Sequence, residues 1–178
     1  FRRVLFRSPL AHMTGALIGV GDVHVEGEKM PALRALAEAG LEALELAPKE
    51  GLALLNGTQV STALALAALF RCEHVLAAAL ASGAMAADAI KGSDTPFDDR
   101  IHQIRGHSRQ SAVAGMLRKL MDGSEIRASH IDCVRVQDPY SIRCQPQVMG
   151  ACLDVMHHVA DVLTIEANAV TDNPLIIA

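Results

Sequence analysis

Residues 60–90 read VSTALALAALFRCEHVLAAALASGAMAADAI, and this stretch decides the fold of the chain. Alanine and leucine dominate it, and these two residues are among the strongest helix formers. It contains no proline and few polar residues, so the sequence predicts one long helix over Val60–Ile90. Lys91 suits the last turn of that helix, and Gly92 suits its end. Because a helix that is apolar nearly all round is normally buried by other helices, the stretch predicts a helix bundle.

The composition of the whole chain also predicts an all-α fold. Hydrophobic residues make up 51% of the 178 residues, whereas aromatic residues make up only 3%. The apolar excess therefore consists mostly of aliphatic helix formers, and the length is sufficient for one domain with its own core. The net charge of −4 comes from interspersed acids and bases, which argues against a nucleic-acid partner.

The sequence gives no signal for a membrane partner or a metal site. Arg71, Glu73 and His74 interrupt the long apolar stretch, and the apolar run near residue 1 is too short for a signal peptide. The eight histidines show no metal-ligand spacing. The cysteines lack CxxC spacing, which predicts reduced thiols in a soluble, cytoplasmic protein; they are Cys72, Cys133, Cys144 and Cys152.

Three shorter segments precede the long helix. Glycines and alternating valines over Gly15–Gly27 predict turns and a short hairpin. Met30–Ala39 predicts a short helix with Pro31 in its first turn. Pro48–Leu55 predicts another short element, which leads into the turn signal Asn56-Gly57.

Two more helices are predicted after the long one. The charged stretch Ser93–Gly106 between them predicts a solvated loop. His107–Met121 predicts a helix, and Gln147–Ala169 predicts an amphipathic helix. The apolar stripe of the latter consists of Val148, Cys152, Val155, Val159 and Val162. Because Val60–Ile90 needs more covering surface than these helices supply, the pattern also predicts association with other chains.

The segment Gln137–Gln147 reads QDPYSIRCQPQ and carries the chemistry. Its two prolines prevent a helix or strand from running through it whole. Arg143 offers a planar fork of donors that matches a carboxylate, and Tyr140 offers a phenol suited to proton transfer. From composition alone, a plain polar loop between helices remains an open alternative.

This segment resembles the signature loop of the histidine ammonia-lyases, within the aromatic amino acid ammonia-lyase superfamily. Two further segments resemble other motifs of that family. They are Pro48–Gln59, reading PKEGLALLNGTQ, and Glu166–Pro174, reading EANAVTDNP. All three occur in the family's order at family-like spacing, and the similarity extends from roughly Pro9 to the end of the chain.

The resemblance implies a long antiparallel helix bundle of the ammonia-lyase and fumarase type, assembled as a homotetramer with active sites shared between subunits. It implies non-oxidative deamination of L-histidine to urocanate and ammonia. By the same resemblance, Arg143 would bind the substrate carboxylate and Asn56 would bond near it. Tyr140 would support proton movements, and Gln137 would orient Tyr140. A turn role for Asn56 and a plain loop amide at Gln137 remain open.

The resemblance also implies that no external cofactor is needed, because the family makes its own electrophile. This group, methylidene-imidazolone (MIO), forms from an Ala-Ser-Gly triad a few residues before the sequence that stands here as Pro9–His12. Positions 3–5 of this chain hold Arg-Val-Leu instead. We therefore interpret residues 1–8 as a foreign or mistranslated junction. Residues 9–178 would be a fragment of the central catalytic domain, truncated at both ends and inactive alone.

An Ala-Ser-Gly does occur at Ala81-Ser82-Gly83, inside the long predicted helix. Helical hydrogen bonds oppose the tight turn that cyclisation needs. These small residues are interpreted as a helix-packing contact, and the MIO triad is taken to be absent.

Two other functions remain open at the level of sequence. One is a tyrosine or phenylalanine ammonia-lyase, or an aminomutase, of the same family. The other is a non-catalytic helical interaction module, which would not need the combination of Arg143, Tyr140 and Asn56. The tail of the signature loop, Cys144–Gln147, favours histidine as the substrate.

Overall fold

The computed structural model describes residues 2–171, 174–175 and 177, with side chains from Pro9 onward. Helices dominate the described residues, as the all-α prediction requires. The chain divides into two compact units. Unit 1 comprises Phe1–Ser61 and Ala169–Ala178, and unit 2 comprises Thr62–Asn168. The residues Asp172 and Asn173 of the third family-like segment lie outside the described residues.

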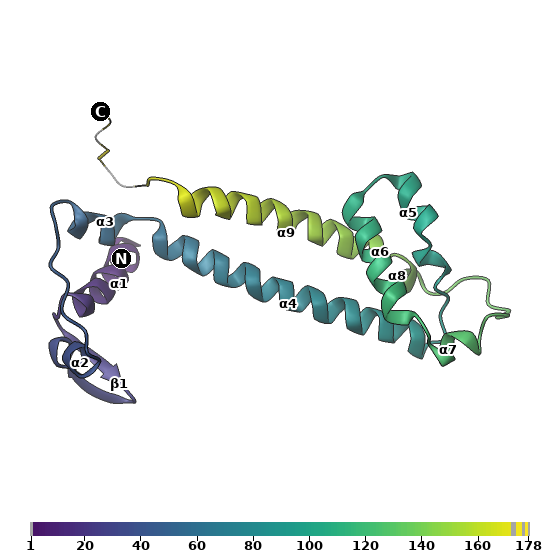
Figure 1. Ribbon diagram of the computed structural model, residues 1–178, viewed down its shortest axis with the longest axis horizontal. Helices are drawn as coiled ribbons and strands as arrows, with labels where there is room; N and C mark the ends of the chain where they lie inside the picture. Colours follow the sequence, from purple (N-terminus) through teal and green to yellow (C-terminus); the bar gives the residue numbers. More distant parts are fainter. Residues whose placement is uncertain (1, 172–173, 176, 178) are drawn as a thin grey trace. The chain divides into compact units, whose positions relative to one another are not determined.

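Unit 1 begins with helix α1, Arg2–Leu17, which has Pro9 inside it. Strands β1, Asp22–Val25, and β2, Glu28–Pro31, then pair in antiparallel fashion. Glu26 and Gly27 connect them, with φ angles of 52° and 89°. Positive φ at both positions is typical of the two-residue turn that matches strand twist. The predicted hairpin is therefore confirmed, but it spans Asp22–Pro31 rather than Gly15–Gly27, and Gly15 lies in α1 (Figure 1).

Two short helices complete unit 1. Helix α2 spans Ala32–Glu38, so the prediction of a helix from Met30 was wrong at its start. Met30 and Pro31 belong to β2, and Pro31 only caps α2. Helix α3 spans Glu50–Asn56, followed by Gly57 with extended backbone. Asn56 is therefore the last helical residue rather than part of a free turn.

Helix α4 spans Gln59–Ala89 and confirms the long helix predicted from residues 60–90. Its C-terminal end differs from the prediction. Lys91 adopts a left-handed φ of 55°. Its N–H donates to Asp88 O at 2.9 Å, and Gly92 N–H donates to Ala87 O at 2.8 Å. This is the Schellman pattern with lysine at the position that glycine usually occupies. Gly92 is needed for another reason, because a Cβ there would lie 2.8 Å from Ala87 O.

The prediction that Ser93–Gly106 is a loop was wrong. This stretch contains the 3-10 helix η1 (Thr95–Phe97) and the helix α5 (Asp99–Arg105). Local capping explains α5. The Asp98 carboxylate accepts from Arg100 N–H at 2.9 Å, and Gly106 closes the helix at a φ of 76°. Hydrogen bonds from the side chain and then the backbone of Arg100 hold the pKa of Asp98 well below its usual range.

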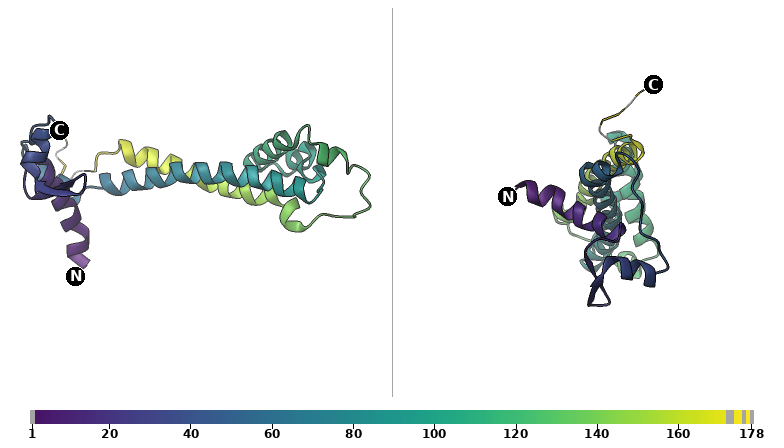
Figure 2. Two further views of the ribbon diagram at one scale, coloured as in Figure 1. Left: turned by 90° about the horizontal axis from the view of Figure 1, so that it is seen from below. Right: turned by 90° about the vertical axis from the view of Figure 1, so that its left-hand side faces the viewer.

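Unit 2 continues with α6, Ser108–Met121, α7, Glu125–Ala128, α8, Tyr140–Arg143, and α9, Gln145–Asn168. Helices α4 and α9 run alongside each other (Figures 1 and 2). They are antiparallel, because Gln145 at the start of α9 bonds to Gly83 near the end of α4. Helix α6 crosses α9 closely. A Cβ on Gly150 of α9 would lie only 2.7 Å from the backbone of Gln110 in α6.

The core of unit 2 lies where the short helices gather around the end of α4 (Figure 1). Its buried residues come from α4, η1 and α6 and are Leu80, Ala84, Ala87, Phe97, Val113, Leu117 and Met121. His102 of α5 is completely buried beside them. Its Nε2 lies 3.0 Å from Pro96 O, and its Nδ1 lies 2.9 Å from Gln110 Nε2. Since a carbonyl only accepts, Nε2 carries the proton and Nδ1 accepts from Gln110.

Much of the apolar surface of α4 and α9 is uncovered. Leu64 and Met85 of α4 are 67% and 71% exposed, and Val155 of α9 is 63% exposed. The predicted stripe of α9 has helical spacing, but its side chains Val148, Val155, Val159 and Val162 are exposed in the structure. Both helices are long and apolar enough to cross a membrane by length and composition. The exposed side chains agree with the expectation that these helices need further covering surface.

Candidate functional site

The segment between the two prolines folds as a single helical turn. Pro139 precedes helix α8, Cys144 ends it, and α9 begins at the next residue. Proline is favoured at such helix starts because its φ is already helical. One turn of helix places Tyr140 and Arg143, three residues apart, on the same side. The Arg143 guanidinium carbon lies 5.5 Å from the centroid of the Tyr140 ring, which is within the range of a cation–π contact.

Arg143 is half-buried, and one of its nitrogens is used inside the protein. Its Nε donates to the main-chain oxygen of Asp138 at 2.9 Å. No carboxylate of the described residues lies within ion-pair distance of Arg143. The two terminal nitrogens of the guanidinium are therefore available as a pair of parallel donors, the arrangement that matches a carboxylate.

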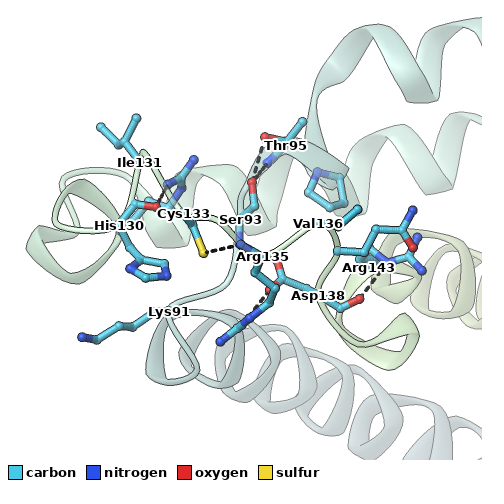
Figure 3. A pocket seen from close by; sticks show the side chains of 13 residues that line it. Lys91, Ser93, Thr95, His130, Ile131, Cys133, Arg135, Val136, Asp138 and Arg143 are labelled. Carbon is cyan, nitrogen blue, oxygen red and sulfur yellow. Dashed lines mark hydrogen bonds and ion pairs between the residues drawn. The ribbon is translucent and has the colours of Figure 1, made fainter.

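A cleft of about 310 Å³ opens beside this arginine, and we call it the Arg143 cleft (Figure 3). Arg143 and Asp138 lie on one side of it, and His130 and Ile131 lie on the other. Its remaining lining residues are Lys91, Ser93, Thr95, Pro96, Arg127, Cys133, Arg135, Val136 and Gln137.

The cleft is rich in cations, but two of them are already paired. Arg127 Nε lies 2.7 Å from Asp94 Oδ1, and Arg135 Nη1 lies 3.0 Å from Asp138 Oδ1. Among the described residues that line this cleft, Arg143 is the arginine whose guanidinium has no carboxylate partner, so it can bind an anionic ligand. The geometry therefore favours a small ligand that carries a carboxylate.

Tyr140 is 71% exposed and lines a second, more open hollow rather than the Arg143 cleft. That hollow is also lined by Arg143, Thr95 and Pro96, so the two spaces share one wall. Gln137 lines the Arg143 cleft. The structure thus brings together Arg143 with Gln137 and Arg143 with Tyr140. A contact from Gln137 that orients Tyr140 stays a prediction.

Asn56 belongs to unit 1, whereas Tyr140, Arg143 and Gln137 belong to unit 2. Asn56 is half-buried at the end of α3. A side-chain amide at a helix end is suited to bonding a ligand oxygen. Its place at a common site with Arg143 stays a prediction.

Ala81-Ser82-Gly83 is a continuous part of α4. Ser82 Oγ donates to Ala79 O at 3.2 Å, and Gly83 O accepts from Gln145 Nε2 at 3.2 Å. A Cβ on Gly83 would lie 2.2 Å from Gln145 Oε1. The prediction that these small residues form a helix-packing contact is confirmed.

Sequence reasoning missed Asp138, whose side chain is only 7% exposed. Its carboxylate accepts from Ser93 N–H at 2.7 Å and from Arg135 at 3.0 Å. An aspartate directly before a proline is a familiar turn signal, but its main partner lies 45 residues earlier in the chain. No local pattern reveals such a pairing.

Comparison with known proteins gives consistent results. The model of the aromatic amino acid lyase family matches residues 7–178. Histidine ammonia-lyase of Burkholderia ambifaria is 61% identical over 169 residues, which are 95% of this chain and 33% of the relative. The enzyme of the same name from Burkholderia multivorans is 60% identical over the same share. This chain spans about a third of the length of these curated relatives.

Solved structures of similar fold include an ammonia-lyase and an aminomutase. Histidine ammonia-lyase from Trypanosoma cruzi gives a TM-score of 0.80 at 36% identity, covering 96% of this chain and 31% of that one. Tyrosine aminomutase from Streptomyces globisporus gives a TM-score of 0.83 at 36% identity, covering 96% of this chain and 36% of that one. The fold is thus shared by enzymes that act on different amino acids.

Proposed function

Because this chain belongs to the aromatic amino acid lyase family, we propose that it is part of an ammonia-lyase that converts L-histidine to urocanate and ammonia. The observation that carries this proposal is the guanidinium of Arg143, which lines a cleft with its two terminal nitrogens available. The 61% identity to the histidine ammonia-lyase of Burkholderia ambifaria supports histidine as the substrate.

Each proposed role follows from the chemistry of the side chain. Arg143 binds the substrate carboxylate through two parallel hydrogen bonds. Asn56 donates its amide hydrogens to an oxygen near that carboxylate. Tyr140 provides a phenol that gives or takes a proton beside the bound amino acid. Gln137 orients Tyr140. Residues 9–178 form part of the helical catalytic domain.

The residues present here do not fit the prosthetic group MIO. Positions 3–5, where the family's triad is expected, hold Arg-Val-Leu and lie in α1. Ala81-Ser82-Gly83 is held in α4 by its own hydrogen bonds and by the contact with Gln145. Joining the Ala81 carbonyl carbon to the Gly83 nitrogen would require breaking that helix.

We predict that the expressed chain contains no MIO and releases no urocanate from histidine. The physical reason is that α4 engages the peptide groups of Ala81–Gly83 in its hydrogen-bond ladder. Intact-mass measurement tests this directly, since MIO formation removes two waters. A deficit of two waters that peptide analysis maps to Ala81–Gly83 would contradict the prediction.

We further propose that the intact protein is a cytoplasmic homotetramer. The exposed apolar side chains along α4 and α9 support this, because monomeric soluble proteins rarely leave such long apolar faces uncovered. Neighbouring helices of other subunits would cover them. No nucleic-acid or membrane partner is proposed.

The catalytic proposal is tested with a chimera. The matched 169-residue stretch of Burkholderia ambifaria histidine ammonia-lyase is replaced by that of this chain, so that the relative supplies all other segments. We expect the chimera to convert histidine to urocanate, followed by the absorbance of urocanate, and to leave tyrosine and phenylalanine unchanged. A folded chimera of native size that deaminates tyrosine or phenylalanine instead would favour the alternative lyases. A folded chimera with no lyase activity would favour the non-catalytic module.

A further inference from the structure

We propose that Asp138 is a positioning residue that aims the guanidinium of Arg143 into the cleft. The inference rests on the proposed role of Arg143 in binding the substrate carboxylate. Asp138 touches Arg143 through its main-chain oxygen and touches the rest of unit 2 through its carboxylate. It thereby connects the ligand-binding side chain to the end of α4.

The carboxylate of Asp138 fixes the position of the residue. Oδ2 accepts from the backbone N–H of Ser93 at 2.7 Å, just after α4 ends. Oδ1 accepts from Arg135 Nη1 at 3.0 Å, and the same nitrogen lies 3.4 Å from Ile90 O. Hydrogen bonds to a charged acceptor are stronger than neutral ones. The segment from Ser129 to Pro139 has no regular helix or strand, so these bonds are what hold the Asp138 backbone in place.

The main-chain oxygen of Asp138 then fixes the orientation of Arg143. It accepts from Arg143 Nε at 2.9 Å, while the Tyr140 ring contacts the guanidinium at 5.5 Å. Figure 3 shows Arg143 beside Asp138, and because Nε is engaged by the Asp138 carbonyl, the two terminal nitrogens stay available as a pair. A bidentate carboxylate contact requires this orientation within a narrow range of angle and distance. Moving the Asp138 carbonyl would turn the fork away from the ligand.

The first test uses the chain itself and does not depend on activity. Solvent exchange of the Arg143 Nε–H is measured by NMR with 15N-labelled arginine, and the signal is assigned by its loss in Arg143→Lys. In Asp138→Asn, which keeps the side-chain shape but replaces one oxygen with a donor facing Arg135, we expect this exchange to accelerate about tenfold. Backbone amides in the core, such as that of Leu117, should exchange at unchanged rates.

Asp132→Asn is the matched control, because Asp132 is exposed in the same segment and the variant has the same change of charge. It should leave the Arg143 Nε–H unaffected. Adding Arg135→Gln to Asp138→Asn creates a neutral amide pair that can hydrogen bond, and it should return the exchange rate toward the original value. If Asp138→Asn fails to fold, Arg135→Gln alone should accelerate exchange to a smaller extent. Equal exchange in all these variants would overturn the inference.

The second test uses the chimera. Asp138→Asn should raise KM for histidine about tenfold while kcat changes far less, because a carboxylate contact made in both ground and transition states mainly affects binding. Asp132→Asn should change neither constant. An active chimera in which Asp138→Asn leaves KM unchanged would overturn the positioning role. An inactive parent chimera would overturn the proposed function instead, and the exchange measurement would still decide whether Asp138 holds Arg143.

Discussion

Leu117→Ala is expected to lower the free energy of unfolding of unit 2 by about 3–5 kcal/mol. Leu117 lies on α6 and is fully buried among Phe97, Val113 and Ala84. Removing its side chain loses the transfer free energy of the buried methyl groups and leaves a cavity that packed helices fill only in part. Because native domains are stable by only about 5–15 kcal/mol, this variant would bring unit 2 close to unfolding.

Leu120→Ala provides a matched control on the same helix. Leu120 is 54% exposed, and alanine has a slightly higher helix propensity than leucine, so its replacement should cost within about 0.5 kcal/mol. Urea titration followed by the circular dichroism of the helices measures both variants. Equal midpoints for Leu117→Ala and Leu120→Ala would show that this cluster is not the core of unit 2.

Arg143→Lys in the chimera is expected to reduce kcat/KM for histidine about 10- to 150-fold, which corresponds to about 1.5–3 kcal/mol of lost charge-assisted hydrogen bonding. The charge is kept, but an ammonium cannot form two parallel hydrogen bonds to one carboxylate. Lysine also lacks the planar group that contacts the Tyr140 ring and the Nε–H that bonds Asp138. The lysine would therefore bind the substrate carboxylate more weakly and would be held less firmly in position.

Arg105→Lys is the control for the loss of a guanidinium as such. Arg105 is exposed in the last turn of α5, where either cation complements the helix dipole. Its replacement should leave the rate and KM unchanged. If Arg143→Lys behaves like Arg105→Lys, Arg143 does not bind the substrate carboxylate.

The uncovered apolar faces of α4 and α9 are compatible by composition with either a membrane or an interface between subunits. By length and hydropathy each helix could cross a membrane. The middle of α4, however, contains Arg71, Glu73 and His74. Burying such polar and charged side chains in the hydrocarbon core of a membrane is energetically unfavourable. An assembly of several bundles covers the same apolar faces and leaves polar side chains room to reach water, which is why we propose a tetramer.

Local sequence determined the long helices and the hairpin. The spacing of apolar residues fixes which backbone conformation can bury them, so residues 60–90 and 147–169 predicted α4 and α9 to within two residues at each end. The glycines of Gly15–Gly27 predicted turns, and Gly27 in the hairpin turn uses glycine's access to positive φ, with a φ of 89°. The residue types of Gln137–Gln147 made this segment a candidate site, and the family resemblance supplied the roles expected of its side chains.

Only the tertiary structure decided how distant residues meet. The caps of α5 are local, but its buried His102 bonds to Pro96 of η1 and to Gln110 of α6, and those contacts depend on how the helices pack. The tertiary structure also joined Asp138 to Ser93 across 45 residues, and the main-chain oxygen of Asp138 accepts from Arg143 beside the cleft. The reason is physical: a hydrogen bond between residues far apart in the chain depends on where whole helices pack. The spacing of apolar residues along the chain predicts the helices, but it does not predict hydrogen bonds between residues on different helices.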